Sequence, residues 1–324
     1  MHTSSRLAPA VALSLLLATT SLAQRLIDVD PALPSYDKTS SLAGNLNSIG
    51  SDTLNNLMTY WAEGFRRYYP SVNVQVEGKG SSTAPTALTV GTSQLGPMSR
   101  KMKVTELEDF EDAHGYRPTA IGVALDSLAV YVHRDNPVPS LSLPEVDAMF
   151  SSTRRGGLTN EIRAWRDVDV PGRLGRRPLS LYGRNSASGT YGYFKKVALF
   201  KGDFKSMVKE QPGSASVVMG VGKDIAVVGY SGIGYKTSDV RVVPLSKKPG
   251  GVAYDPTYEN VLSGRYPLGR MLYVYVDKDP NEELPPMVSE FLKYMLSQEG
   301  QRVVVKDGYL PLTPALAARE LAKF

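Results

Sequence analysis

Three segments of the chain share one order of features, and this order constrains the fold more than any other property of the sequence. In each, a short apolar strand is followed by a turn rich in Ser, Thr, Asp or Gly, and then by an amphipathic helix. The segments are residues 45–65, 72–88 and 177–200. Such alternation of strands and helices predicts an α/β fold.

The length of 324 residues, with 42% hydrophobic content, fits one large or two ordinary domains.

Each turn places hydroxyl groups where a helix begins and its backbone N–H groups lack intrahelical partners. Together with the positive end of the helix dipole, these donors favour a bound oxyanion. Ordinary N-capping is the alternative for any one turn, because Ser, Thr and Asp are common capping residues. Three such turns together favour a shared ligand. The candidates are Asp52 and Thr53, then Ser81, Ser82 and Thr83, then Ser188, Gly189 and Thr190.

Arg184 lies beside the third turn, in the stretch "YGRNSASGTYGYFKK". Its guanidinium is a permanent charge with a planar fork of donors, which suits a tetrahedral oxyanion. The alternative is an exposed or ion-paired arginine with no ligand, since most arginines remain at the surface.

Other segments have their own local signals. Residues 142–152, "SLPEVDAMFSS", are typical of a capped helix with Pro144 in its first turn. Residues 270–278, "RMLYVYVDK", predict a strand. Residues 285–312 predict one long helix followed by a structured terminal segment.

The first 23 residues have the pattern of a secretory signal peptide. Arg6 precedes an apolar stretch from Leu7 to Ala18, and Ser21-Leu22-Ala23 forms a small-residue cleavage pattern, so that the mature chain begins at Gln24. The apolar stretch is shorter than the roughly 20 residues of a spanning helix. The chain has no Cys, which excludes disulfides, thiolate metal sites and a lipid-bearing cysteine. We expect a periplasmic protein of a Gram-negative cell, with further secretion left open.

The charge is only mildly basic. Removing residues 1–23 takes away Arg6 and no acid, so the formal net charge falls from +5 to 5 − 1 = +4. Lys and Arg are scattered among acids, which argues against a nucleic-acid partner. We interpret the small group of Arg173, Arg176 and Arg177 as a solvated loop.

The sequence lacks the motifs that would support catalysis. The only histidines are His2, His114 and His133, and no H-E-x-x-H pair, G-x-S-x-G elbow or complete P-loop is present. We expect a structural role for His133, which lies in a predicted strand. The sequence therefore predicts no enzyme, no metal site and no cofactor.

Several fragments together resemble the substrate-binding proteins of phosphate-specific ABC transporters. They are "IGSDTLNNLM", "GKGSSTAPTAL", "LGPMSRKM", "LSLPEVDAMFSSTRRGG" with the later "WRDV", and "GRNSASGTYGYF". The resemblance extends from about Leu46 to near the C-terminus. It implies a type II periplasmic binding protein fold, with two α/β lobes of mixed sheets flanked by helices and two hinge strands near residues 122–130 and 266–274.

The expected organisation follows from this resemblance. It comprises a signal peptide at 1–23, an extension of unassigned role at 24–44, a first lobe at 45–126 plus 268–324, and a second lobe at 127–267.

The resemblance also implies roles for the candidate residues. Phosphate would be bound by Asp52 and Thr53, by Ser81 of the second turn with its neighbours Ser82 and Thr83, and by Arg184, Ser188, Gly189 and Thr190. Ser99, in the loop "GPMSRKM", completes the candidate set.

Two departures from the family pattern concern acids. Several relatives have an aspartate at the position of Ser99 that accepts the proton of phosphate, and relatives often have an acid at the position of Ser186 that orients the arginine. We hypothesise that Asp52 takes over the acceptor role, with ordinary capping as the alternative. A carboxylate acceptor would reject sulfate, which carries no proton near neutral pH.

The expected function is that of a monomeric periplasmic receptor that captures inorganic phosphate and delivers it to an inner-membrane ABC permease. One alternative is a receptor for another tetrahedral oxyanion, such as sulfate, molybdate or arsenate. Another is a secreted phosphatase or adhesion protein on the same scaffold.

Overall fold

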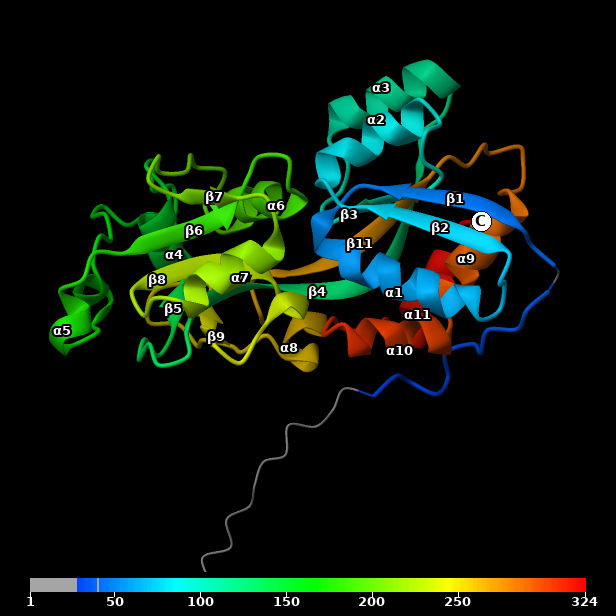
Figure 1. Ribbon diagram of the computed structural model, residues 1–324. Helices are drawn as coiled ribbons and strands as arrows, with labels where there is room; N and C mark the ends of the chain where they lie inside the picture. Colours follow the sequence, from blue (N-terminus) through cyan, green and yellow to red (C-terminus); the bar gives the residue numbers. More distant parts are fainter. Residues whose placement is uncertain (1–27, 40) are drawn as a thin grey trace, which may run out of the picture.

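The computed structural model describes residues 28–39 and 41–324. The predicted signal peptide and its cleavage point lie outside this range. Figure 1 shows two α/β lobes side by side, joined by two strands that run from one lobe into the other. The predicted two-lobed α/β fold is confirmed.

The first lobe contains both ends of the described chain (Figure 1). Its strand β1 (Gly44–Ile49) pairs in parallel with β2 (Val72–Glu77), and a bridge from Ser48 to Leu95 connects β1 with the segment that leads into β3 (Gly96–Met98). The helices of this lobe are α1 (Asn55–Arg66), α2 (Ala84–Thr89), α3 (Val104–His114), α9 (Pro286–Leu296), α10 (Gln298–Lys306) and α11 (Pro314–Leu321). Short 3-10 turns precede α1 and α2, namely η1 (Asp52–Leu54) and η2 (Ser81–Thr83).

The second lobe is built around β6 (Ser180–Arg184), which pairs in parallel with β7 (Lys209–Gln211) and β8 (Val227–Gly232). Its remaining strands are β5 (Leu141–Ser142), β9 (Val240–Val242) and β10 (Leu245–Ser246). Its helices are α4 (Leu143–Phe150), α5 (Gly172–Gly175), α6 (Gly189–Val197), α7 (Ser214–Gly222) and α8 (Tyr258–Leu262), with 3-10 turns η3 (Trp165–Val168) and η4 (Ile233–Tyr235).

Two long strands join the lobes. Strand β4 (Thr119–His133) pairs antiparallel with β11 (Gly269–Val276) from Thr119 to Ser127, and with β8 from Leu128 to Val132. The sheet order β3-β11-β4-β8-β6-β7 therefore passes through both lobes. This arrangement confirms the two hinge strands.

The three predicted strand–turn–helix units are all present, as β1–η1–α1, β2–η2–α2 and β6–α6. Helix α1 buries Leu57, Met58, Trp61 and Phe65 at the spacing of one helical face. The expected capped helix is α4, whose first turn contains Pro144 and whose Ser142 hydroxyl accepts from the Glu145 N–H.

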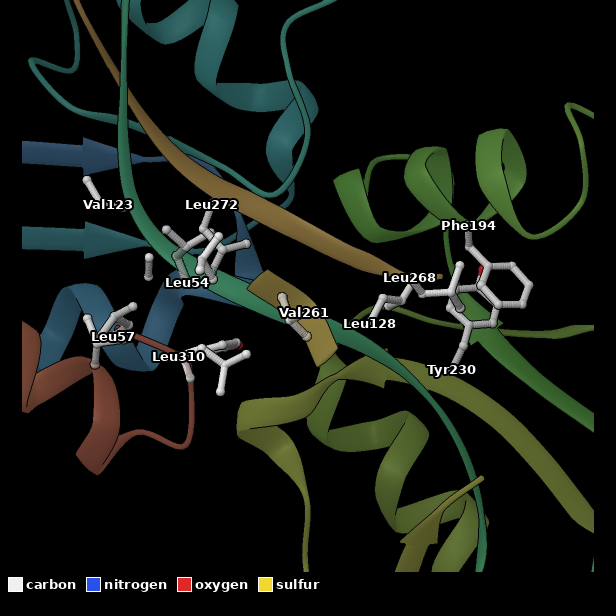
Figure 2. Packing of buried hydrophobic residues seen from close by; sticks show 14 of the residues in the cluster. Leu54, Leu57, Val123, Leu128, Phe194, Tyr230, Val261, Leu268, Leu272 and Leu310 are labelled. Carbon is white, nitrogen blue, oxygen red and sulfur yellow. The ribbon is translucent and has the colours of Figure 1, made fainter. Parts of the chain in front are cut away.

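Buried side chains form a core that extends through both lobes. Figure 2 shows Leu54, Leu57, Leu272 and Leu310 grouped towards one end of the hinge strands, with Phe194 and Tyr230 towards the other end. The rings of Phe194 and Tyr230 stack with their centroids 3.8 Å apart. This contact fixes α6 against β8, so the N-terminus of α6 is held at a defined position between the lobes.

The single long helix predicted from residue 285 onward is wrong. The segment forms two helices, because Ser297 has extended backbone angles (φ −77°, ψ 170°) and caps α10 by accepting from the Gly300 N–H. Its hydroxyl also donates to the Tyr294 carbonyl. The apolar periodicity continues through this break, whereas the capping geometry of Ser297 ends one helix and starts the next.

Part of the extension before β1 packs against the first lobe. Val29, Leu33 and Tyr36 are buried, and the Tyr36 hydroxyl donates to Glu290 at 2.8 Å. The Tyr36 N–H donates to Glu299. These contacts lie at α9 and α10. They hold the segment in a defined position although its sequence has no secondary-structure periodicity.

Candidate functional site

The three hydroxyl-rich turns meet between the lobes. The Oγ1 atoms of Thr53 and Thr190 lie 2.9 Å apart, which joins the first turn to the third. The second turn reaches the third through the Ser82 N–H, which donates to the carbonyl of Ala187 at 3.1 Å. The Ser81 and Ser99 hydroxyls lie 3.2 Å apart, and the Ser99 N–H donates to the Ser81 hydroxyl. A buried hydroxyl cluster therefore connects elements that are distant in sequence.

Gly189 permits this close approach. A Cβ atom at this position would lie 2.4 Å from the Ser81 hydroxyl and 2.6 Å from the Ser99 hydroxyl, both inside van der Waals contact. Gly80 makes the matching approach from the first lobe, with φ at 125° and a hypothetical Cβ 2.7 Å from the Ala187 carbonyl oxygen. Both glycines are required for the N-terminus of α6 to lie against the second turn.

Ordinary capping explains only part of this pattern. Ser188 caps α6 by accepting from the Thr190 N–H at 3.1 Å. Asp52 directs its carboxylate to Ser214, and Ser81 accepts from Ser99, so neither side chain caps the helix that follows it. Thr83 donates to the Gly80 carbonyl within its own turn.

Arg184 is the charged centre of the site and is 1% exposed. Its Nη1 lies 2.9 Å from Asp52 Oδ2 and donates to the Ser214 hydroxyl, while Nη2 donates to the Pro212 carbonyl. Asp52 Oδ2 also accepts from the Ser214 N–H and hydroxyl, at 2.9 and 2.8 Å. Asp52 and Ser214 therefore orient the arginine, whereas Ser186, where relatives often have the orienting acid, is exposed.

One donor of Arg184 is left over. Its Nε is buried and has no hydrogen-bond partner among the described residues. Burial lowers the pKa of Arg184, and the Asp52 carboxylate acts in the opposite direction. A buried donor without a partner is costly, and such atoms are rare outside sites that bind a ligand or water.

A second buried arginine, which the sequence analysis missed, lies on the hinge strands. Arg270 donates through Nε and Nη2 to Asp126 Oδ2 at 2.8 and 2.6 Å, and the two residues face each other across β11 and β4. Arg270 also donates to the Thr190 hydroxyl and to the Ser99 carbonyl, both at 3.0 Å. The sequence does contain a signal for this pair. Asp126 is the single acid in the predicted hinge segment 122–130, and Arg270 is the single base in the predicted hinge segment 266–274.

Two tyrosines hold the first turn from behind. The Tyr235 hydroxyl donates to the Asp52 carbonyl at 2.7 Å, and the Tyr309 hydroxyl donates to the Thr53 carbonyl at 2.6 Å. Burial raises the pKa of both tyrosines, so both remain protonated donors. These bonds fix the carbonyl groups of Asp52 and Thr53, and the Leu54 N–H donates to the Ser51 carbonyl at 3.2 Å, so the turn is held in one conformation.

The remaining candidates lie at the margin of the cluster or outside it. The Ser82 hydroxyl accepts from Arg100 at 3.2 Å. His133 accepts locally from the Asp135 N–H. In the described range, His, Asp and Glu side chains do not gather in threes as a metal site would require. The arrangement is suited to binding an anion by hydrogen bonds and charge.

Two α/β lobes, joined by a pair of strands and enclosing a buried polar cluster, define a type II periplasmic binding protein. The family model described as "PBP superfamily domain" matches residues 37–299, and the chain belongs to this family. The match begins earlier than the expected start near Leu46. Membership of this family confirms that the protein belongs to a class of binding proteins and not of enzymes.

Named relatives agree with this assignment. The chain is 54% identical over 312 residues to the phosphate-binding protein PstS of Pseudomonas aeruginosa, covering 96% of each chain. It is 29% identical to Protein SphX of Synechococcus elongatus, covering 83% of this chain and 77% of the relative. A transporter substrate-binding protein from Clostridium perfringens, solved with bound phosphate, has the same fold, with a TM-score of 0.71 and 24% identity over 83% of this chain and 100% of that one.

Proposed function

We propose that this protein binds inorganic phosphate between its two lobes and delivers it to an ABC permease of the inner membrane. The observation that carries the proposal is the buried Arg184, whose Nε lacks a partner, beside the capped N-terminus of α6. Charge, hydroxyl donors and a helix N-terminus then converge on one small volume, as a tetrahedral oxyanion requires. The 54% identity to a protein named for phosphate binding supports phosphate as the anion.

Each candidate residue has a role in this proposal. Thr53, Ser81, Ser188, Gly189 and Thr190 supply hydroxyl and N–H donors, and Arg184 supplies the charge. Ser99, Ser82 and Thr83 support the second turn, since the Ser81 hydroxyl contacts Ser99 and the Ser82 N–H contacts the third turn.

Asp52 has two roles in the proposal. Within the described residues, the hydrogen bonds accepted by its carboxylate all end on Oδ2, which also pairs with Arg184. Oδ1 is then available to accept the proton of phosphate. This second role would favour protonated phosphate over sulfate, because an ionised acceptor repels an anion that carries no proton.

Binding is coupled to closure of the lobes. The contacts between Thr53 and Thr190, and between Ser82 and Ala187, bring both lobes to the site. A ligand that bridges both lobes shifts a hinge equilibrium towards the closed state. We assign residues 45–126 plus 268–324 to the first lobe and 127–267 to the second. The change of partner along β4, between Ser127 and Leu128, lies one residue from this boundary and supports it.

We further propose that the receptor works as a periplasmic monomer without a nucleic-acid partner, and that residues 1–23 direct its export. None of the helices in the described part of the chain combines the length and apolar character needed to cross a bilayer. The short basic group of Arg173, Arg176 and Arg177 is exposed, and Arg177 pairs with Asp224.

Thermal-shift and calorimetric titrations with phosphate, sulfate, molybdate and arsenate test the ligand class. Selective binding to the native state raises the melting temperature. We expect phosphate to raise the melting temperature more than sulfate or molybdate does. A larger increase with sulfate or molybdate would favour the alternative receptors. Turnover of a phosphomonoester by metal-stripped protein would instead support the phosphatase alternative.

A further inference from the structure

A groove of about 710 Å³ lies directly beside the candidate site. Ser99, Ser188 and Arg270 line the groove and also belong to the candidate site, where Arg270 donates to Ser99 and to Thr190, and Ser188 accepts from the Thr190 N–H. One wall is the loop of residues 99–103 in the first lobe, and the other is α6 of the second lobe. Figure 1 shows α6 facing the first lobe, with β11 passing between the lobes.

The charges along this groove have one sign. Its lining includes Arg100, Lys101, Lys103, Lys195, Lys196 and Arg270, and none of the described lining residues is Asp or Glu. The whole chain has a formal net charge of only +5, so the groove concentrates positive charge locally.

Two of these cations are uncompensated. Arg100 pairs with Glu106 at 2.6 Å, Lys195 with Asp203 at 2.9 Å, and Arg270 with Asp126. Lys103 lies 3.8 Å from Glu106. In contrast, Lys101 and Lys196 are exposed and form no ion pair within residues 28–39 and 41–324.

The two uncompensated lysines belong to opposite walls. Lys101 lies in the loop of the first lobe, and Lys196 lies on α6. The walls are close, because a Cβ on Gly192 of α6 would lie 3.5 Å from Cδ of Arg100, an ordinary contact distance. A narrow cleft with one sign of charge on both walls focuses the electric field and raises the local concentration of anions.

We propose that this groove is the access route by which phosphate reaches the site, and that Lys101 and Lys196 accelerate its association. This inference rests on the proposed function and adds to it the path by which phosphate enters and the residues that raise its association rate. Because both lysines lie outside the hydrogen-bonded candidate site, their charge acts by long-range attraction, which lowers the free energy of the approaching anion and of the bound anion by similar amounts relative to free phosphate.

The test compares the double variant Lys101→Gln/Lys196→Gln with the control Lys223→Gln/Lys248→Gln. The control removes the same two charges from exposed positions outside the groove. Association and dissociation rates of inorganic phosphate are measured by stopped-flow fluorescence, and affinities by calorimetry, at low and high salt. Tyr191, Tyr193 and Tyr273 line the groove and serve as intrinsic reporters.

We expect the groove variant to associate at least about threefold more slowly than the wild type near 10 mM salt, with an unchanged dissociation rate. The difference should disappear near 1 M salt, where the Debye length is only about 3 Å. An unchanged association rate, or an equal decrease in the control, would overturn the proposal that the charge of Lys101 and Lys196 draws phosphate through this groove. A wild-type protein that fails to bind phosphate would overturn the proposed function as well, so calorimetry separates the two failures.

Discussion

The carboxylate of Asp52, in the turn after β1, lies 2.9 Å from the guanidinium of Arg184, at the end of β6. This ion pair joins the two lobes and supplies the orienting acid that the sequence pattern lacks at Ser186. It also makes Asp52 the counter-charge of a buried arginine, so we expect its replacement to alter stability and, under the proposed function, anion selectivity.

Replacing Asp52 with Asn should affect both properties. The buried Arg184 loses its counter-charge, and we expect the free energy of unfolding to fall by about 2 kcal/mol, because Asp52 is partly exposed. Sulfate affinity should rise relative to phosphate affinity, since the variant lacks the repelling acceptor. Urea unfolding and calorimetry measure these effects, with the exposed Asp239→Asn as control. An unchanged phosphate-to-sulfate ratio would contradict the acceptor role, and unchanged stability would contradict the ion pair.

Replacing Arg184 with Lys keeps the charge but removes the planar fork of donors. We expect phosphate binding to weaken by about 100-fold, or about 3 kcal/mol. Ser188→Ala removes one hydroxyl donor and should cost about 1 kcal/mol. Isothermal titration calorimetry measures both, and Arg177→Lys at an exposed ion pair should have no effect. Equal and negligible losses in the first two variants would place the site elsewhere.

Gly189 and Gly192 form a matched pair on α6. In Gly189→Ala, the new methyl group would overlap the hydroxyls of Ser81 and Ser99, so the lobes should not close fully and phosphate affinity should fall by at least about tenfold. In Gly192→Ala, the methyl group meets only Arg100 at an ordinary distance, and affinity should be retained. Small-angle scattering with saturating phosphate would show whether the first variant remains more open. Equal affinities would mean that the close approach at Gly189 is not needed for binding.

The pair of Asp126 and Arg270 should stabilise the hinge through a strong coupling. Single replacements Asp126→Asn and Arg270→Met each leave a buried charge without its counter-charge, and we expect each to cost about 3 kcal/mol in the free energy of unfolding. The double variant should cost about 2 kcal/mol less than the sum. The exposed pair of Arg177 and Asp224 provides the control cycle, with an expected coupling below about 1 kcal/mol. Additive effects at the hinge pair would refute the coupling.

Asp307 at the C-terminus of α10 should make stability depend on pH. Burial raises its pKa to about 7. Between the unfolded pKa near 4 and this value, the folded protein binds a proton that the unfolded chain releases, so stability falls as pH rises. From pH 4.5 to pH 8, the free energy of unfolding of Asp307→Asn should therefore rise by about 1 kcal/mol relative to that of the wild type, after allowance for partial exposure. Urea titrations at both pH values test this, with exposed Asp109→Asn as control; an equal difference at both values would contradict it.

The order of strand, hydroxyl-rich turn and helix was readable from the sequence because it depends on local periodicity. The break at Ser297 was not, since apolar spacing continues across it. The packing of the N-terminal extension against the first lobe was not readable either. Its Tyr36 is held by Glu290 and Glu299 from the far end of the chain, and no local pattern records such contacts.

By itself, the sequence determined the α/β class and the three turns with their donors, and it pointed to Arg184 as a candidate binding residue. Local backbone preferences and family motifs are sufficient for these features. Only the tertiary structure decided which acid pairs with Arg184, that Arg270 and Asp126 join the site, and that like charges face each other across the groove. The physical reason is that each of these contacts depends on how two lobes pack around the hinge strands, and a buried charge is stabilised by whichever partner that packing brings within reach.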